Sequence, residues 1–356
     1  MNDLGGDMTQ PARAYADAGV NLDAADRAKL QMRDAIRATH GPQVLGGMGG
    51  FGGLFAIDGL GLREPVLVSS IDGVGTKLKI AFTLNRHDSV GKDLVSHCVN
   101  DILVCGAKPL FFLDYLALGA MDGDQAVAVV RGVAEGCRET GCALIGGETA
   151  AMPGFYAPGE YDLAGAIVGV VERERIITGQ GIRAGDVAIG FPSLGLHTNG
   201  YALARHALAN DDLSATPAEL SRALGDELLQ PHRCYLNDIW PLLEQGLVAG
   251  MAHITGGGLV DNVPRVLPDG LGVDFDATTW DILPIFRLIQ RRGDISWDEM
   301  QRVFNLGIGF VAFVHREQVE QTLALASAAG ARPVGVVRAL ADDPAGTPRV
   351  RVEGLA

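Results

Sequence analysis

Residues 89–118, SVGKDLVSHCVNDILVCGAKPLFFLDYLAL, carry the pattern that decides the fold. From Val90 to Cys105 the apolar residues recur every three or four positions, which predicts a helix over 89–105 that is buried along one face and ends at Gly106. The continuous apolar run at 110–118 is typical of a buried strand. A helix followed directly by a strand predicts a layer of helices packed on a sheet.

The flanking segments repeat this alternation. Before residue 172 the pattern predicts strands at 66–71, 142–145 and 161–171 and a helix at 124–140. A charged stretch from Glu172 to Arg175 then breaks the apolar pattern, so we place a domain boundary there, which gives domains 1–172 and 173–356. The second domain mixes strands at 186–191, 307–314 and 333–337 with helices from 199 and over 259–266, 284–290, 297–304 and 316–328. The predicted fold class is α/β, mixed with α+β, in two domains.

Composition and charge exclude several classes of protein. The chain has 356 residues, 47% of them hydrophobic, which is enough for two domains with full cores. With 29 Lys and Arg against 43 Asp and Glu the net charge is −14, so neither nucleic acid nor an anionic membrane is an expected partner. Five cysteines without a Cys-x-x-Cys pair argue against a disulfide framework and a thiolate zinc site. No secretion signal or membrane-length apolar stretch is visible, so we expect a cytoplasmic protein.

Glycine is enriched, with 48 residues, and one glycine-rich segment spans 46–53. Gly47, Gly49 and Gly52 match the G-x-G-x-x-G spacing of dinucleotide-binding loops, but no strand precedes the segment and no clear helix follows it. Two interpretations stay open: a flexible loop, or a loop whose bare backbone closes over a phosphate.

The segment Asp72-Gly-Val-Gly-Thr-Lys77 directly follows the predicted strand 66–71. A carboxylate, two glycines and a lysine so close together suit a site for a metal ion and a phosphate, although the Walker A pattern occurs nowhere in the chain. The alternative is a turn with a solvated lysine.

Polar side chains form a stripe on the predicted helix 89–105. Asp93, His97, Asn100 and Asp101 fall at helical spacing, so they share one face. A solvated face is the ordinary explanation of such a stripe, but carboxylate and amide oxygens also suit Mg²⁺. His97 by itself is better explained as a packing or hydrogen-bonding residue than as a ligand.

A further carboxylate, Glu148 in Gly146-Gly-Glu-Thr149, follows the predicted strand 142–145. The carboxyl ends of strands are where α/β proteins usually form their sites, so Asp72, Asp101 and Glu148 are expected to converge. Three carboxylates brought together repel one another unless a cation lies between them, which predicts bound Mg²⁺ rather than a bare acid–base pair.

Two more glycine-bracketed segments precede predicted helices. In Gly195-Leu-His-Thr-Asn-Gly200, Thr198 or Asn199 is a candidate helix cap, and His197 is a candidate acid, base or phosphate donor. In His253-Ile-Thr-Gly-Gly-Gly258, free amides at a helix N-terminus favour an anion site at Thr255, Gly256, Gly257 and Gly258.

These motifs, in this order, resemble the aminoimidazole ribonucleotide synthetase family, also called the phosphoribosylformylglycinamidine cyclo-ligases. The resemblance covers residues 15–335 and also rests on 15–20, 98–101, 109–115 and 262–268. It implies two domains of an ATP-binding superfamily without a P-loop, whose N-terminal domains pair into a homodimeric β-barrel. It also implies a reaction of de novo purine synthesis: ATP-dependent ring closure of formylglycinamidine ribonucleotide to 5-aminoimidazole ribonucleotide, with release of ADP and phosphate.

The resemblance implies roles for individual residues. Mg²⁺ is held by Asp72, Asp101 and Glu148. The catalytic residues are Asp72, Lys77 and His197, with Lys77 on the ATP phosphates and His197 facing the transferred phosphoryl group or the formyl amide. The phosphate of the substrate binds at 255–258. The residues implied in nucleotide binding are Gly49, Gly50, Phe51, Gly52, Gly53, Asp72, Gly73, Gly75, Thr76, Lys77, Asp93, Asn100 and Thr149.

Three positions depart from the family pattern. Leu196 stands where the family usually has proline, Leu306 where cysteine is common, and Arg33 where a lysine near ATP is common. These changes bear on local geometry more than on the reaction, and Arg33 keeps the positive charge.

Other functions remain as alternatives. Selenophosphate synthetase, of the same superfamily, needs a reactive cysteine near its N-terminus, whereas the first cysteine here is Cys98. Thiamine-monophosphate kinase, a hydrogenase-maturation dehydratase and formylglycinamidine ribonucleotide synthetase are further superfamily members. A catalytically silent nucleotide-binding scaffold would lack the metal carboxylates. A nicotinamide-dependent dehydrogenase would rest on the glycine-rich segment alone.

Overall fold

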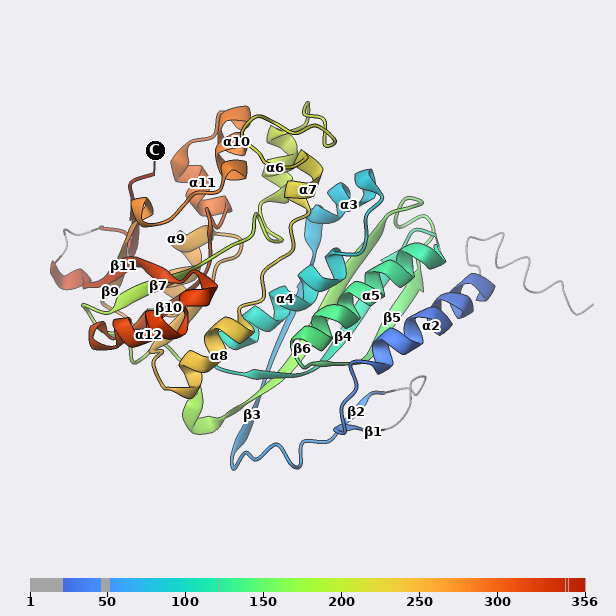
Figure 1. Cartoon of the computed structure of the whole chain (residues 1–356), viewed down its shortest axis with the longest axis horizontal. Helices are drawn as coiled ribbons and strands as arrows, with labels where there is room; N and C mark the ends of the chain where they lie inside the picture. The colour runs from blue at the N-terminus through green and yellow to red at the C-terminus, as the bar shows by residue number, and fades with distance from the viewer. Residues whose placement is uncertain (1–21, 46–51, 121, 343, 345, 356) are drawn as a thin grey trace, which may run out of the picture.

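The computed structural model describes residues 22–45, 52–120, 122–342, 344 and 346–355. They form two layered domains, each with its own main sheet (Figure 1). The first domain contains a four-stranded sheet in the order β3-β6-β4-β5. Its strands are β3 (Pro65–Gly73), β4 (Lys108–Leu118), β5 (Ala143–Ala151) and β6 (Tyr161–Glu172). Strand β6 is antiparallel to β3 and β4, whereas β4 and β5 are parallel.

Helices cover one face of this sheet. α4 (Val90–Leu103), α5 (Gly123–Glu139) and α2 (Leu22–Arg37) run beside one another, with α5 against both of the others (Figure 1). α4 and α5 approach closely because both carry glycine where they meet: a Cβ on Gly91 would lie 2.3 Å from the carbonyl oxygen of Val129. Fully buried residues such as Leu94 and Val133 fill the layer below, and removing this apolar area from water stabilises the domain. The short elements are β1 (Val44–Leu45), β2 (Leu54–Phe55), η1 (Gly75–Lys77) and α3 (Leu78–Leu84).

The second domain contains a six-stranded sheet in the order β12-β9-β11-β7-β10-β8. Neighbouring strands are antiparallel except β12 and β9. The strands are β7 (Val187–Pro192), β8 (Gly250–His253), β9 (Leu271–Asp276), β10 (Ile308–Val314), β11 (Arg332–Ala339) and β12 (Val350–Glu353). The helices around it include α6 (Tyr201–Ala207), α7 (Leu224–Leu228), α8 (Leu236–Glu244), α9 (Gly258–Asn262), α10 (Pro284–Gly293), α11 (Trp297–Val303) and α12 (Val319–Leu325). In the described residues, neither main sheet takes strands from both sides of residue 172.

The predicted mixture of helices and strands is confirmed, with differences in extent and direction. The strand predicted at 142–145 continues to Ala151, and the helix predicted at 316–328 is broken into η5 (Arg316–Gln318), α12 and η6 (Ser327–Ala329). α2, β8, β9 and β12 were not predicted. The alternation of strand and helix suggested a sheet whose strands have their carboxyl ends at the same edge. Both main sheets are instead mostly antiparallel.

The face of the first sheet opposite its helices is apolar and open. Leu67, Ile71, Leu113 and Tyr115 are exposed there, Ile71 by 73%. Contiguous exposed apolar surface of this kind marks an interaction site. In the described part of the chain no helix is long and apolar enough to cross a membrane. The five cysteines are free thiols, as expected.

Candidate active site between the two domains

The polar stripe on α4 faces the second domain. Asp93, His97 and Asn100 are buried, because residues 230–235 of the second domain lie over them. The solvated face that such a stripe ordinarily indicates is therefore wrong here. Buried polar side chains need hydrogen-bond partners, and these partners define the site.

Asn100 and Asp93 bond to the backbone of the segment that covers them. Asn100 Oδ1 accepts the N–H of Tyr235 at 2.9 Å, and its Nδ2 donates to the carbonyl oxygen of Arg233 at 2.8 Å. Asp93 Oδ1 accepts the N–H of His232 at 2.7 Å. We expected both side chains to bind the nucleotide; the structure instead uses them to join the two domains.

Lys77 makes a buried ion pair in the same interface. Its Nζ lies 2.7 Å from Asp93 Oδ2 and donates to the carbonyl oxygen of Gln230 at 2.7 Å, and both side chains of the pair are 0% exposed. Burial lowers the pKa of Lys77 and raises that of Asp93, and the charge of each partner opposes the change. We expected Lys77 either to be solvated or to bind a phosphate. Neither interpretation fits this placement, because protein groups enclose the ammonium group.

His97 links Asp72 to the second domain. Its Nε2 lies 2.8 Å from Asp72 Oδ2, and its Nδ1 lies 2.7 Å from Thr198 Oγ1. Burial alone raises the pKa of Asp72, but the hydrogen bond and charge of His97, with the N–H of Gly73, outweigh burial and lower the pKa. Asp72 is therefore an ionised carboxylate at neutral pH.

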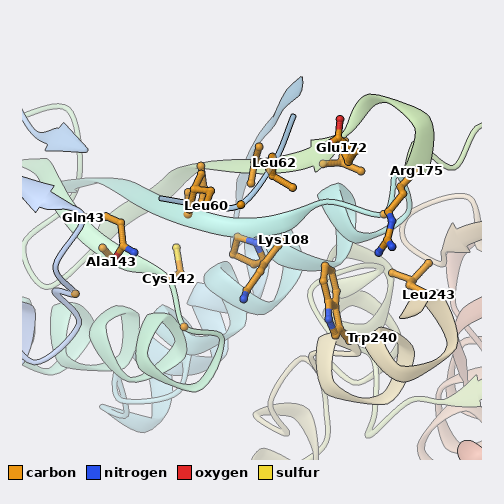
Figure 2. Close-up of a pocket in the computed structure, with 18 of the residues that line it drawn as sticks. Gln43, Leu60, Leu62, Lys108, Cys142, Ala143, Glu172, Arg175, Trp240 and Leu243 are labelled. Carbon is orange, nitrogen blue, oxygen red and sulfur yellow. The ribbon is translucent and has the colours of Figure 1, made fainter. Parts of the chain in front are cut away.

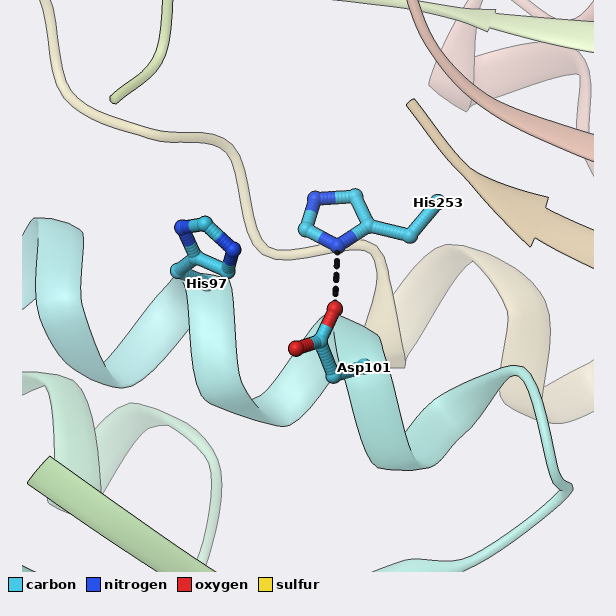
Figure 3. A group of neighbouring side chains, drawn as sticks. All are labelled: His97, Asp101 and His253. Atoms are coloured by element: carbon cyan, nitrogen blue, oxygen red, sulfur yellow. Dashed lines mark hydrogen bonds and ion pairs between the residues drawn. The ribbon is translucent and has the colours of Figure 1, made fainter. Parts of the chain in front are cut away.

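A second histidine holds Asp101. His253 Nδ1 lies 2.8 Å from Asp101 Oδ1 (Figure 3), and Ser70 Oγ donates to Asp101 Oδ2 at 2.9 Å. Burial raises the pKa of Asp101, but the hydrogen bond and charge of His253, together with the charge of His97 and the hydrogen bond from Ser70, outweigh burial and lower the pKa. Burial lowers the pKa of His253 although its bond to Asp101 opposes this.

His232 connects the two histidines. Its Nδ1 lies 3.2 Å from Thr198 Oγ1, and its Nε2 lies 3.0 Å from His253 Nε2. A continuous line of polar contacts thus joins the two carboxylates, in the order Asp72, His97, Thr198, His232, His253 and Asp101. We did not predict His232, because no motif surrounds it and only the fold brings it to α4.

Burial lowers the pKa of His232 well below its ordinary value, which couples folding to pH. Below the unfolded-state pKa of about 6.5, the unfolded chain binds a proton here that the folded protein does not, so stability falls as pH falls. Between about pH 6 and 5 we expect the free energy of unfolding to fall more steeply than in His232→Gln, by up to about 1.4 kcal/mol per pH unit. Urea unfolding of both proteins across this range is the measurement; parallel pH profiles would mean that His232 is already protonated when folded.

His197 is fully buried on a strained backbone. Its φ is +62°, a left-handed value that is costly outside glycine, and its ring stacks on His232 with centroids 4.2 Å apart. Its Nδ1 has no hydrogen-bond partner in the described part of the chain. Burial lowers its pKa well below the ordinary value, so the ring is neutral. Strain and an unpaired buried nitrogen are typical of functional positions, but the catalytic role of His197 stays a prediction.

The glycines at 256–258 have a packing explanation in part. Gly257 and Gly258 have φ of +99° and +58°, and a Cβ on Gly258 would lie 2.0 Å from the carbonyl oxygen of Gln301. Asn262 Nδ2 donates to the carbonyl oxygen of Gly258 at 2.9 Å and so fixes the turn. Gly256 is exposed, which leaves its backbone open to a ligand. The phosphate site at Thr255 to Gly258 therefore stays a prediction.

Glu148 does not join Asp72 and Asp101. β3 and β5 form opposite edges of the sheet, three strand spacings or about 14 Å apart. Through β6 and β4, Asp72 is in register with Gly147 of β5. Because successive side chains of a strand point to opposite faces of the sheet, Glu148, one position later, points to the face opposite that of Asp72. The predicted convergence of three carboxylates is therefore wrong within one chain. It assumed parallel neighbours, and β3 is antiparallel to its neighbour.

The remaining residues expected to bind the nucleotide lie in two places. Gly75 and Thr76 are exposed in the turn after Asp72 and Gly73. Gly53 lies against Ile145 of β5, at the opposite edge of the sheet from that turn. Gly52, beside it in the sequence, is exposed, and Thr149, further along β5, is half-buried. Gly49, Gly50 and Phe51 lie outside the described residues.

A cavity of about 1160 Å³ opens elsewhere, between the first domain and α8 (Figure 2). Lys108, Arg175 and Trp240 are among the residues that line it. Among the residues that the structure describes, none of the predicted site residues borders this cavity.

Comparison with known proteins identifies the family. The model of the AIR synthase related protein, N-terminal domain, matches residues 60–171, and that of its C-terminal domain matches residues 183–342. The phosphoribosylformylglycinamidine cyclo-ligase of Desulfitobacterium hafniense is 53% identical over 317 residues, which cover 89% of this chain and 94% of that protein. The chain belongs to the phosphoribosylformylglycinamidine cyclo-ligase family. The cyclo-ligase of Geobacillus thermodenitrificans is likewise 53% identical over 308 residues, 86% of this chain and 89% of its own.

Solved structures show the same fold at low sequence identity. Thiamine-monophosphate kinase from Stenotrophomonas maltophilia has a TM-score of 0.67 at 19% identity and covers 92% of this chain and 96% of its own. Hydrogenase maturation protein HypE in complex with ATP has a TM-score of 0.66 at 16% identity and covers 95% and 93%. The predicted cyclo-ligase membership is confirmed, and the chain is an ATP-dependent ligase.

Proposed function

We propose that this chain closes the imidazole ring of formylglycinamidine ribonucleotide to give 5-aminoimidazole ribonucleotide, with ATP converted to ADP and phosphate. The observation that carries the proposal is the pair of carboxylates Asp72 and Asp101, each held by a histidine, beside the exposed turn at 75–76. The names of the cyclo-ligase relatives support the same reaction.

The chemistry requires an activated amide oxygen. Transfer of the γ-phosphoryl group of ATP to the formyl oxygen releases ADP, and loss of the formamide N–H proton leaves an iminophosphate. The amidine nitrogen then attacks the formyl carbon, the bond from that carbon to the phosphorylated oxygen breaks, and phosphate leaves as the nitrogen loses a proton. A site for this sequence acts mainly by positioning the reactants and stabilising negative charge.

The carboxylates of Asp72 and Asp101 fit Mg²⁺, because both are ionised and partly exposed oxygen donors. When bound there, Mg²⁺ supplies charge neutralisation on the nucleotide phosphates. His97 and His253 orient the two carboxylates toward the domain interface. We further propose that Thr255 to Gly258 take the phosphate of the substrate, with the exposed backbone of Gly256 as donor.

The direct test supplies the purified chain with ATP, Mg²⁺ and formylglycinamidine ribonucleotide. We expect phosphate and aminoimidazole ribonucleotide in equal amounts, measured by phosphate release and by the colorimetric reaction of the aminoimidazole. ATP turnover without the aminoimidazole product, or no turnover, would overturn the proposed function and favour the related kinases or a silent scaffold.

We also propose a homodimer that pairs the open faces of two first-domain sheets. The exposed apolar residues Leu67, Ile71, Leu113 and Tyr115 support it, since water disfavours such a surface. In Ile71→Glu we expect a monomer by light scattering where the natural chain is a dimer. Leu325→Glu, at a residue 46% exposed on α12, is the control and stays dimeric. Monomers in the natural protein, or dimers in Ile71→Glu, would contradict the proposal.

A further inference from the structure

The cavity between the first domain and α8 is separate from the candidate active site. Glu172 borders the cavity and pairs with Pro65 at the start of β3, whereas Asp72 lies near the end of that strand. At about 3.3 Å per residue, β3 sets the two places roughly 23 Å apart. The volume of about 1160 Å³ is large enough for a small organic ligand, whose sites usually measure about 300–1,000 Å³.

The carboxylates that border this cavity already have partners in the protein. Glu172 accepts the backbone N–H of Arg63 at 2.7 Å, and Glu174 pairs with the side chain of Arg63 at 3.1 Å. Glu244 accepts the indole N–H of Trp240 at 3.0 Å. The acidic groups are therefore engaged by neighbouring protein groups.

Three cations that border the cavity have no such partner. Lys108 on β4, Arg138 on α5 and Arg175 after β6 are all exposed. Within the ranges that the structure describes, their side chains make no hydrogen bond or ion pair. The chain as a whole has a net charge of −14, so unpaired positive charge around one cavity is a local feature. Such a group of cations attracts an anion, and phosphate suits it because lysine and arginine both bind phosphate oxygens.

Helix α8 adds an aromatic ring to the same space. In Figure 2 the side chains of Lys108 and Trp240 project into it from β4 and α8, with Arg175 beside them. Trp240 is half-buried, and its bond to Glu244, one helical turn later, fixes the orientation of the indole. Leu243 of the same helix supplies an apolar wall. An indole held in this way offers a surface on which a flat ring can stack.

We propose that this cavity binds a nucleoside phosphate, with the phosphate among Lys108, Arg138 and Arg175 and the base on Trp240. A ligand with both a flat ring and a phosphate uses the cations and the indole together, whereas an inorganic anion leaves the indole and the apolar wall without a function. The proposal goes beyond the proposed ring closure and does not rest on it.

The cavity borders both sides of the domain interface. Lys108 lies shortly after α4 in the chain, and α4 carries Asn100. Trp240 lies on α8, which begins directly after Tyr235, and the N–H of Tyr235 donates to Asn100. A ligand that contacts both Lys108 and Trp240 thus bridges the same two elements that this hydrogen bond joins. Because it binds the folded protein alone, it raises the midpoint of thermal unfolding and acts as an effector that favours the closed interface.

The test measures binding of AMP to the full chain through quenching of tryptophan fluorescence. We expect saturable quenching that Trp240→Phe removes, because the ring that contacts the base is then gone. Equilibrium dialysis should show a loss of affinity for AMP of at least about tenfold in Lys108→Met and in Arg138→Met. Arg131→Met is the matched control, since it removes an exposed cation of α5 that does not border the cavity, and it binds AMP normally.

Asp101→Asn distinguishes this cavity from the candidate active site. Natural affinity in Asp101→Asn with reduced affinity in Lys108→Met supports the proposal, and the reverse pattern would overturn it. No binding of AMP, or inorganic phosphate that binds as tightly as AMP, would also overturn it. No readout uses turnover, so a chain that forms no aminoimidazole product can still bind AMP here, and a chain that forms the product can fail this test.

Discussion

Lys77→Met will lower the free energy of unfolding by about 3–5 kcal/mol. The substitution leaves the Asp93 carboxylate in a site where it is 0% exposed and has lost its counter-charge. Removing one partner of a buried pair costs more than removing both, because the remaining charge is desolvated without compensation. Urea unfolding monitored by circular dichroism measures the change.

Two further variants separate this effect from a general loss of charge. Lys77→Met with Asp93→Asn should recover part of the stability, since the amide stays neutral and still accepts the N–H of His232. Lys92→Met removes a partly exposed pair with Glu139 at 2.7 Å and should cost at most about 1 kcal/mol. A Lys77→Met protein as stable as Lys92→Met would mean that the ammonium is solvated and free to meet a phosphate.

Asp101→Asn will reduce turnover by about 10²–10³-fold while the protein stays folded. The substitution keeps the shape of the side chain but removes the negative charge that faces His253 Nδ1 at 2.8 Å and that we propose to hold the metal. The loss should appear in kcat more than in the KM of the formylglycinamidine substrate, because the carboxylate acts on charge that develops during phosphoryl transfer.

Glu135→Gln is the matched control, since it removes one carboxylate from an exposed position on α5. Its kcat should stay within about twofold of the natural value. Circular dichroism and the midpoint of urea unfolding check that Asp101→Asn is folded. Turnover in Asp101→Asn equal to that of the control would exclude Asp101 from the metal and phosphate chemistry.

Local periodicity made the first-domain elements predictable. α4 and β4 follow from the apolar spacing at 90–105 and the apolar run at 110–118, because burial on one helix face or in a sheet repeats at a fixed interval. The polar stripe on α4 was equally visible, and its side chains do lie at the candidate site. The segment that covers this stripe, residues 230–235, could not be predicted, because it carries no periodic or motif signal.

Pairing between distant segments made the rest unpredictable. Lys77 followed a strand and two glycines, so a phosphate was the natural partner to expect; Asp93, on a helix that follows it in the chain, is the partner found. Glu148 and Asp72 are separated because β3 and β5 are opposite edges of a mixed sheet, and strand order depends on contacts that no local pattern encodes. His232 and Thr198 join the site only through the packing of one domain on the other.

The buried polar contacts between the α4 stripe and residues 230–235 also make the folding of each domain depend on the other. A first domain cut off before β7 would expose Asp93 and Asn100 without the N–H groups of His232 and Tyr235 that they accept. Neither half has a complete set of partners alone, so we expect heat to melt both together, in a single calorimetric peak. A chimaera that takes one domain from a relative must therefore bring residues 230–235 and the α4 stripe from the same parent.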